Sequence, residues 1–146
     1  MTAALPPCIA DLIPHAGRMC LLERVVTWDD DSVLIATGTH RAHDHPLRRE
    51  GRLDPVHLCE YGAQAMAVHG GLLAQRDGGR ARPGFLVSLR DVSLATVVLE
   101  ECGSDLEVRA RRIHGAASGW QYEFSVEHEG RRLASGRATV ALRAAT

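Results

Sequence analysis

A carboxylate and two polar neighbours stand out in residues 54–70, a stretch otherwise made mostly of small and apolar residues. In a helix at 100° per residue, Glu60 lies about 60° from His57 and about 40° from Gln64, so the three side chains share one face. A carboxylate on a buried helix must be paired, protonated or functional. Desolvation would disfavour its charged form and keep a proton available near neutral pH. Glu60 is therefore a candidate general acid, with Gln64 and His57 beside it.

The helix that positions these residues has recognisable start and stop signals. Pro55 suits the first helical position, and Asp54 before it can cap the exposed backbone amides. The helix ends either at Gly70-Gly71 or at Gly78-Gly79. His69 projects from the side opposite Glu60. Small and apolar residues all round the cylinder predict a buried helix that neighbouring backbone approaches closely.

The remaining elements are strands with alternating or continuous apolar character. A polar loop over residues 40–52, with three histidines and Pro46, leads into the helix and is long enough to reach over a site. Antiparallel strands with one solvent-exposed face, together with a single long apolar helix, predict an α+β fold in which the sheet wraps around the helix. The edges of so small a sheet favour a dimer with an isologous interface. The predicted strands are residues 19–28, 33–39, 85–94, 106–113, 121–127 and 134–142.

The length, charge and cysteine spacing of the chain limit the class of protein to which it can belong. Its 146 residues predict one domain spanning 1–146, and a formal charge of −1 with a pI near 6.7 disfavours nucleic-acid or anionic-membrane partners. The four cysteines form no CxxC pair, so they indicate free thiols in a reducing compartment and no zinc site. No stretch has the apolar length of a membrane span or the pattern of a signal peptide. We expect a soluble cytoplasmic protein.

Three motifs carry a resemblance to a known family. Leu-Ile-Pro-His at residues 12–15 leads into the apolar residues 19–25, the helix reads Glu-Tyr-Gly-Ala-Gln-Ala at 60–65, and Gly-Ser-Asp-Leu at 103–106 precedes an alternating strand. Together they resemble the hot-dog-fold 3-hydroxyacyl-[acyl-carrier-protein] dehydratases, particularly the small dehydratases of aryl polyene biosynthesis. The resemblance covers most of the chain, and the helix motif is its most specific part. It implies a hot-dog fold and the conversion of a 3-hydroxyacyl thioester to the trans-2-enoyl thioester.

The resemblance also implies a catalytic histidine in the loop before the helix. Better-known members of the family place it in Gly-His-Phe-Pro-Gly; here residues 44–51 read Asp-His-Pro-Leu-Arg-Arg-Glu-Gly, and His45 is the best counterpart. His45 would take the C2 proton as base, and Glu60 would protonate the departing C3 hydroxyl. Backbone N–H groups at the helix start would stabilise the thioester oxygen. The expected substrate-binding residues are Gln64, His57, Pro46 and Val56.

Partners follow from the same resemblance. It implies a homodimer whose two sites lie at the subunit interface, each taking its histidine and glutamate from different protomers. The acyl group would arrive on the phosphopantetheine of an acyl carrier protein, with no metal or redox cofactor. Four arginines are candidates for contact with the acidic carrier: Arg80, Arg82, Arg111 and Arg112.

Two other functions stay open, because a fold does not fix chemistry. A hot-dog acyl thioesterase uses a helix carboxylate toward the thioester carbonyl and needs no loop histidine. A noncatalytic acyl-binding partner subunit would need no acid–base pair. The polar residues have alternative roles as well: Gln64 could serve only to orient Glu60, and His57 could be an alternative base, a supporting residue or a dimer contact. The remaining histidines have ordinary expected roles: His15 as a structural hydrogen-bonding residue, His40 and His43 as loop residues, and His69, His114 and His128 at surface or satisfied core positions.

Overall fold

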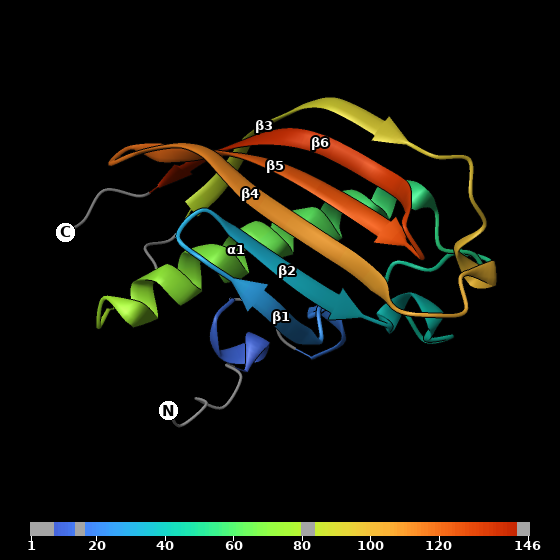
Figure 1. The fold of residues 1–146 in the computed structure, drawn as a ribbon. Helices are drawn as coiled ribbons and strands as arrows, with labels where there is room; N and C mark the ends of the chain where they lie inside the picture. The colour runs from blue at the N-terminus through green and yellow to red at the C-terminus, as the bar shows by residue number, and fades with distance from the viewer. Residues whose placement is uncertain (1–7, 14–16, 80–83, 143–146) are drawn as a thin grey trace.

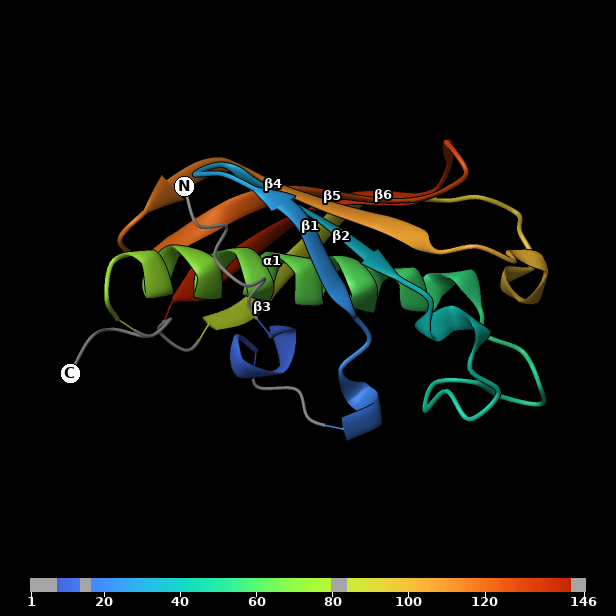
Figure 2. The ribbon, with the colours of Figure 1, turned by 60° about the horizontal axis from the view of Figure 1, so that its bottom comes forward.

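A computed structural model describes residues 8–13, 17–79 and 84–142. Six strands form one antiparallel sheet in the order β1-β2-β4-β5-β6-β3, and α1 lies against one face of it (Figure 1). The view turned by 60° shows the sheet curving over the helix (Figure 2). This is the predicted α+β hot-dog arrangement. The strands are β1 (Arg24–Trp28), β2 (Ser32–Thr37), β3 (Gly84–Leu94), β4 (Leu106–Ala116), β5 (Gly119–His128) and β6 (Arg131–Leu142).

The helix follows its predicted signals with one change at its start. A 3-10 turn, η4 (Pro55–His57), precedes α1 (Leu58–Arg76), so the α-helical hydrogen bonds begin one turn later than the prediction. Asp54 caps this turn, accepting the N–H of Val56 at 2.9 Å. The helix ends before Gly78, whose φ of 80° is the left-handed conformation typical of a helix C-terminus. The later of the two predicted ends is therefore the observed one.

The first strand is shorter than predicted, because its expected beginning serves another purpose. β1 begins at Arg24 instead of residue 19. The backbone before it is held by side chains: Leu21 donates its N–H to Gln64 Oε1 at 2.9 Å, and the Leu21 carbonyl accepts the hydroxyl of Thr39 at 2.6 Å. A segment whose polar groups are bonded to side chains has no need of a strand partner. It becomes a wall beside the polar face of α1.

A glycine fixes how closely α1 approaches the sheet. A Cβ added at Gly62 would lie 2.4 Å from Cδ2 of Phe124 on β5, and one added at Gly136 on β6 would lie 2.8 Å from Cε1 of the same ring. Phe124 is buried between them. The predicted close approach of backbone to this helix is therefore real, and only a residue without a side chain fits at Gly62.

One edge of the sheet exposes apolar side chains on both faces. β3 pairs with β6 along one side and, among residues 8–13, 17–79 and 84–142, has no strand neighbour on the other. Its apolar side chains remain exposed, and Val87 reaches 62 % exposure. Such an edge is a template for pairing with another chain. The exposed large apolar residues of β3 are Phe85, Leu86, Val87, Leu89, Val92 and Leu94.

Two further features bear on the sequence-based expectations. All four cysteines are free thiols. Across residues 8–13, 17–79 and 84–142, none of the helices has the length and hydropathy needed to span a bilayer.

Candidate active site

The imidazole of His45 is buried, with 5 % exposure, and both of its nitrogens are engaged. Nδ1 accepts the backbone N–H of Leu47 at 3.1 Å, and Nε2 lies 3.0 Å from the hydroxyl of Tyr61 on α1. Because Nδ1 is an acceptor, the neutral ring carries its proton on Nε2 and donates it to Tyr61. The two rings stack with their centroids 6.1 Å apart. His45 thus joins the loop to the helix.

A chain of hydroxyl groups continues from this histidine. The Tyr61 hydroxyl lies 2.9 Å from Thr39 Oγ1, which in turn donates to the Leu21 carbonyl at 2.6 Å. With His45 as the donor to Tyr61, every hydroxyl in the chain donates onward, so each polar atom has a partner. The chain connects the loop, α1 and the segment before β1. Fully satisfied networks of this kind rigidify their surroundings.

The ionisation of both rings follows from their burial. Desolvation lowers the pKa of His45, and the nearby positive charge of Arg48 lowers it further. Desolvation also raises the pKa of Tyr61 to about 12. At neutral pH the pair is therefore an uncharged imidazole beside an uncharged phenol, as the hydrogen-bond directions require.

Arg48 holds the loop that carries His45. Its guanidinium, with a side chain only 10 % exposed, forms an ion pair with Glu100 at 2.8 Å. It also donates to the carbonyls of His40 at 2.9 Å, Ala42 at 2.9 Å and Gly51 at 3.3 Å. Glu100 belongs to the connection between β3 and β4. One side chain thus fastens three points of the loop to the connection between β3 and β4.

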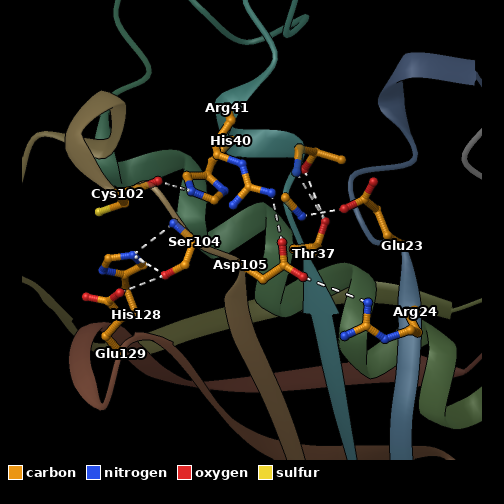
Figure 3. A network of polar contacts seen from close by, with 12 residues as sticks. Glu23, Arg24, Thr37, His40, Arg41, Cys102, Ser104, Asp105, His128 and Glu129 are labelled. Atoms are coloured by element: carbon orange, nitrogen blue, oxygen red, sulfur yellow. Dashed lines mark hydrogen bonds and ion pairs between the residues drawn. The ribbon is translucent and has the colours of Figure 1, made fainter.

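A second network fastens the start of the same loop, as Figure 3 shows. His40 is completely buried, and its Nε2 bonds the carbonyl of Cys102 at 2.8 Å. Arg41, beside it, pairs with Asp105 at 2.9 Å. His40 was expected to be an ordinary loop histidine; the structure makes it a core residue whose pKa is lowered by desolvation. His43, by contrast, is exposed as expected.

Glu60 lies on α1 next to Gln64, as the spacing predicts. The amide of Gln64 is buried and fully used, accepting from the Leu21 N–H at 2.9 Å and donating to the Met19 carbonyl at 2.7 Å and to Glu60 Oε1 at 3.1 Å. Glu60 itself is half-buried. Gln64 therefore fixes one carboxylate oxygen of Glu60, a residue that is only half-buried.

The other predicted site residues lie at the helix entrance. His57 is half-buried and lines a cavity of about 300 Å³ together with Leu47 and Pro55. Pro46 and Val56, which were expected to bind substrate, are exposed, and neither lines this cavity. The structure thus brings Glu60 together with Gln64 and His45 together with Tyr61.

His69 and His128 take the satisfied positions expected of them. His69 is buried on the far part of α1, where its Nε2 donates to the Asp29 carbonyl at 2.9 Å and its Nδ1 accepts from the Tyr122 hydroxyl at 2.7 Å. His128 bonds Ser104 Oγ at 2.9 Å (Figure 3). His114 is exposed, and His15 lies outside the described residues. Within those residues, no group of three or more His, Cys, Asp or Glu side chains could hold a metal ion.

Comparison with protein families settles the class of this fold's chemistry. A family model described as ApeP-like, ApeP dehydratase, matches residues 7–144. The chain belongs to the ApeP-like dehydratase family. The predicted identity as a hot-dog dehydratase of the aryl polyene type is therefore confirmed. None of the curated proteins matches the sequence significantly.

Solved structures similar to this ApeP-like dehydratase include a dehydratase and thioesterases. The dehydratase heterocomplex ApeI:P from Xenorhabdus doucetiae matches with a TM-score of 0.82 and 22% identity, over 97% of this chain and 93% of that one. A hypothetical thioesterase protein with coenzyme A from Streptococcus pneumoniae TIGR4 has a TM-score of 0.60 and 12% identity, over 82% and 84%. A mutant thioesterase PA1618 from Pseudomonas aeruginosa has a TM-score of 0.59 and 14% identity, over 82% and 79%. At these identities the structural likeness establishes the fold alone.

Three residues of the site escaped sequence reasoning. Tyr61 sits next to Glu60 in an apolar helix, where a buried tyrosine needs a hydroxyl partner, and that need was the available signal. Thr39 lies at the end of a predicted strand and Arg48 in the polar loop after it, and no spacing distinguishes either residue from its solvated neighbours. Their roles depend on contacts with Leu21 and Glu100, which are distant in the sequence.

Proposed function

We propose that this ApeP-like dehydratase removes water from a 3-hydroxyacyl thioester carried on an acyl carrier protein, with Glu60 as the general acid. A base takes the C2 proton, the C2–H electrons form the C2=C3 double bond, and the C3 hydroxyl leaves as water after receiving the proton of Glu60. Backbone N–H groups at the start of α1 would stabilise the charge on the thioester oxygen. The reaction needs no redox cofactor, since no electrons are gained or lost.

The observation that carries this proposal is the Glu60–Gln64 pair. Gln64 Nε2 donates to Glu60 Oε1 at 3.1 Å. The amide oxygen of Gln64 accepts the Leu21 N–H, and its nitrogen also donates to the Met19 carbonyl. Gln64 is thereby prevented from rotating, and one oxygen of Glu60 has a defined position. The second oxygen is the proposed proton donor. A positioned acid on the family's helix motif is what the dehydration step requires.

The base is proposed to come from a second subunit. His45, the base implied by the resemblance, has its Nδ1 lone pair bonded to Leu47 and its Nε2 proton donated to Tyr61. A base needs an open lone pair within reach of the substrate. This geometry favours a positioning role for His45 within its own chain, and a homodimer would only repeat the same arrangement. A different hot-dog subunit would supply an open histidine.

The exposed edge of β3 is the proposed contact with that subunit. Its apolar side chains, such as Val87 at 62 % exposure, would be buried by strand pairing across the interface. The ApeI:P structure is a dehydratase heterocomplex, which supports a partner subunit for this chain. We propose the cytoplasm as the location, consistent with four unpaired thiols.

The Glu60→Gln variant tests the acid. Gln at this position keeps an acceptor for Gln64 and nearly the same volume, so the fold should be unchanged, but it has no acidic proton. Turnover of a 3-hydroxyacyl thioester should fall by about 10²- to 10⁴-fold, the usual contribution of a positioned acid. Near-normal turnover by a variant with an unchanged circular dichroism spectrum would rule out the assignment.

The chain alone and the chain mixed with a second hot-dog subunit test the base. Dehydration should appear only in the mixture, and light scattering should give the mass of a heterodimer or a multiple of it. Full activity of the purified chain alone would refute the need for a partner. Release of free thiol in step with acyl loss would instead identify a thioesterase.

A further inference from the structure

We propose that Arg49 and Arg52 form a clasp for the phosphate group of a phosphopantetheine-linked substrate, at the mouth of the cavity beside the start of α1. This inference rests on the proposed function and names how that substrate is held. The sequence motifs gave no indication that either arginine binds substrate.

The backbone places the two guanidinium groups on one side of a tight hairpin. Arg49 and Arg52 exchange both backbone hydrogen bonds, at 2.8 and 2.9 Å, and form an isolated antiparallel bridge. The two residues between them, Glu50 and Gly51, have φ angles of 52° and 77°. Two left-handed residues in a two-residue loop are the mark of a type I′ turn. Directly opposed residues of such a pair project from the same face.

Two like charges in opposed positions destabilise a hairpin by themselves. Glu50 at the tip adopts a left-handed conformation that a residue with a side chain rarely occupies, which adds local strain. Both costs persist in the folded chain. An anion held between the two guanidinium groups would turn their repulsion into attraction, and two planar forks suit phosphate oxygens.

A cavity opens directly beside the pair. Arg49 and Arg52 both line the volume of about 300 Å³ at the helix entrance, and much of the remaining wall is apolar, from Leu47, Leu53, Pro55, Val97 and Val98. Leu47 is also the residue whose N–H bonds His45. A ligand that combines an anionic group with an aliphatic and amide chain matches a basic mouth and an apolar wall. The phosphopantetheine arm has this composition.

The acidic groups of the cavity are already committed elsewhere. Glu100 pairs with Arg48 at 2.8 Å and accepts the Leu53 N–H at 3.1 Å, and Asp54 caps the helix start. Within the described part of the chain, Arg49 and Arg52 take part in no ion pair. Their charges therefore remain available to an incoming anion.

The test compares Arg49→Gln/Arg52→Gln with a control, Arg109→Gln/Arg132→Gln, which removes the same charge from exposed arginines outside the cavity. Both variants are assayed in the active assembly on one 3-hydroxyacyl group attached to four carriers: acyl carrier protein, coenzyme A, 4′-phosphopantetheine and pantetheine. Only pantetheine lacks phosphate. Loss of the clasp should raise KM by about tenfold or more for the three phosphate-bearing substrates, with kcat and the pantetheine reaction unchanged. The control should leave all four reactions unchanged.

Each alternative outcome is decisive. Equal losses on pantetheine and 4′-phosphopantetheine would overturn the clasp, as would a loss confined to the intact carrier protein, which would mean contact with the protein surface. A uniform loss in the control variant would attribute the effect to net charge. If the unaltered protein dehydrates none of the substrates, the proposed function fails. Calorimetric binding of 4′-phosphopantetheine against pantetheine would then still test the arginines.

Discussion

Replacing Tyr61 with Phe removes one hydroxyl from the network that joins His45 to α1. The hydroxyl accepts the Nε2 proton of His45 at 3.0 Å, so its loss leaves one buried N–H without an acceptor. Thr39 keeps its bond to the Leu21 carbonyl at 2.6 Å. One orphaned buried donor costs about 1–3 kcal/mol of unfolding free energy. For a chain of this length, the melting temperature should fall by about 3–10 °C.

The chain offers a matched control in Tyr122→Phe. The Tyr122 hydroxyl donates to Nδ1 of His69 at 2.7 Å, so this variant also breaks one buried tyrosine–histidine bond, far from the loop. Urea denaturation should find both variants destabilised by similar amounts. In a His45→Ala background, Tyr61→Phe should cost little, since no N–H remains to be orphaned. Tyr122→Phe should keep its full cost there.

Turnover separates the structural role of His45 from a catalytic one. If His45 positions the loop, His45→Ala and Tyr61→Phe should lower dehydration by similar, modest factors. If His45 is the base, His45→Ala alone should lower it by about 10²-fold or more. An unfolding free energy for Tyr61→Phe within about 0.5 kcal/mol of the parent would refute the hydrogen-bond reasoning itself.

Two further predictions concern stability. Burial lowers the pKa of His40, His45 and His69 in the folded chain, so the unfolded chain binds protons first as pH falls below about 6.5. Stability should be full above that pH and decline below it, by up to about 1.4 kcal/mol per pH unit for each histidine, as urea titrations at pH 8, 6.5 and 5 would measure. Arg48→Met should cost about 1–3 kcal/mol, because the partly exposed Glu100 loses its ion pair and the loop carbonyls lose their donor, and Arg48→Lys should not restore the loss, since an ammonium cannot reach three carbonyls and a carboxylate together. Equal stability of Arg48→Lys and the parent would contradict this account.

The local features of this fold were predictable and the long-range ones were not. The cap at Asp54, the pairing of Glu60 with Gln64 and the opposite placement of His69 follow from helix geometry alone. The first strand was predicted too long, because nothing near Leu21 reveals that a glutamine 43 residues later takes its N–H. His45 was singled out as the counterpart of the family's loop histidine, but its partner depends on which way the ring turns in the folded loop. Pattern and spacing describe single elements, whereas orientation between elements requires the fold.

The ring of Phe124 between two glycines has a consequence for how the substrate range of this scaffold could change. Since Gly62 lies two residues from Glu60, the height of the acid above the sheet is set by a contact that tolerates no added atom. A substitution cannot change the depth of the acyl site by moving α1, because any side chain added at Gly62 would also displace Glu60. New chain lengths would have to be accommodated where the backbone has latitude, in the loop of residues 40–52 and along the partner strand. The loop of residues 40–52 can therefore vary, whereas the contact between Gly62 and Phe124 cannot.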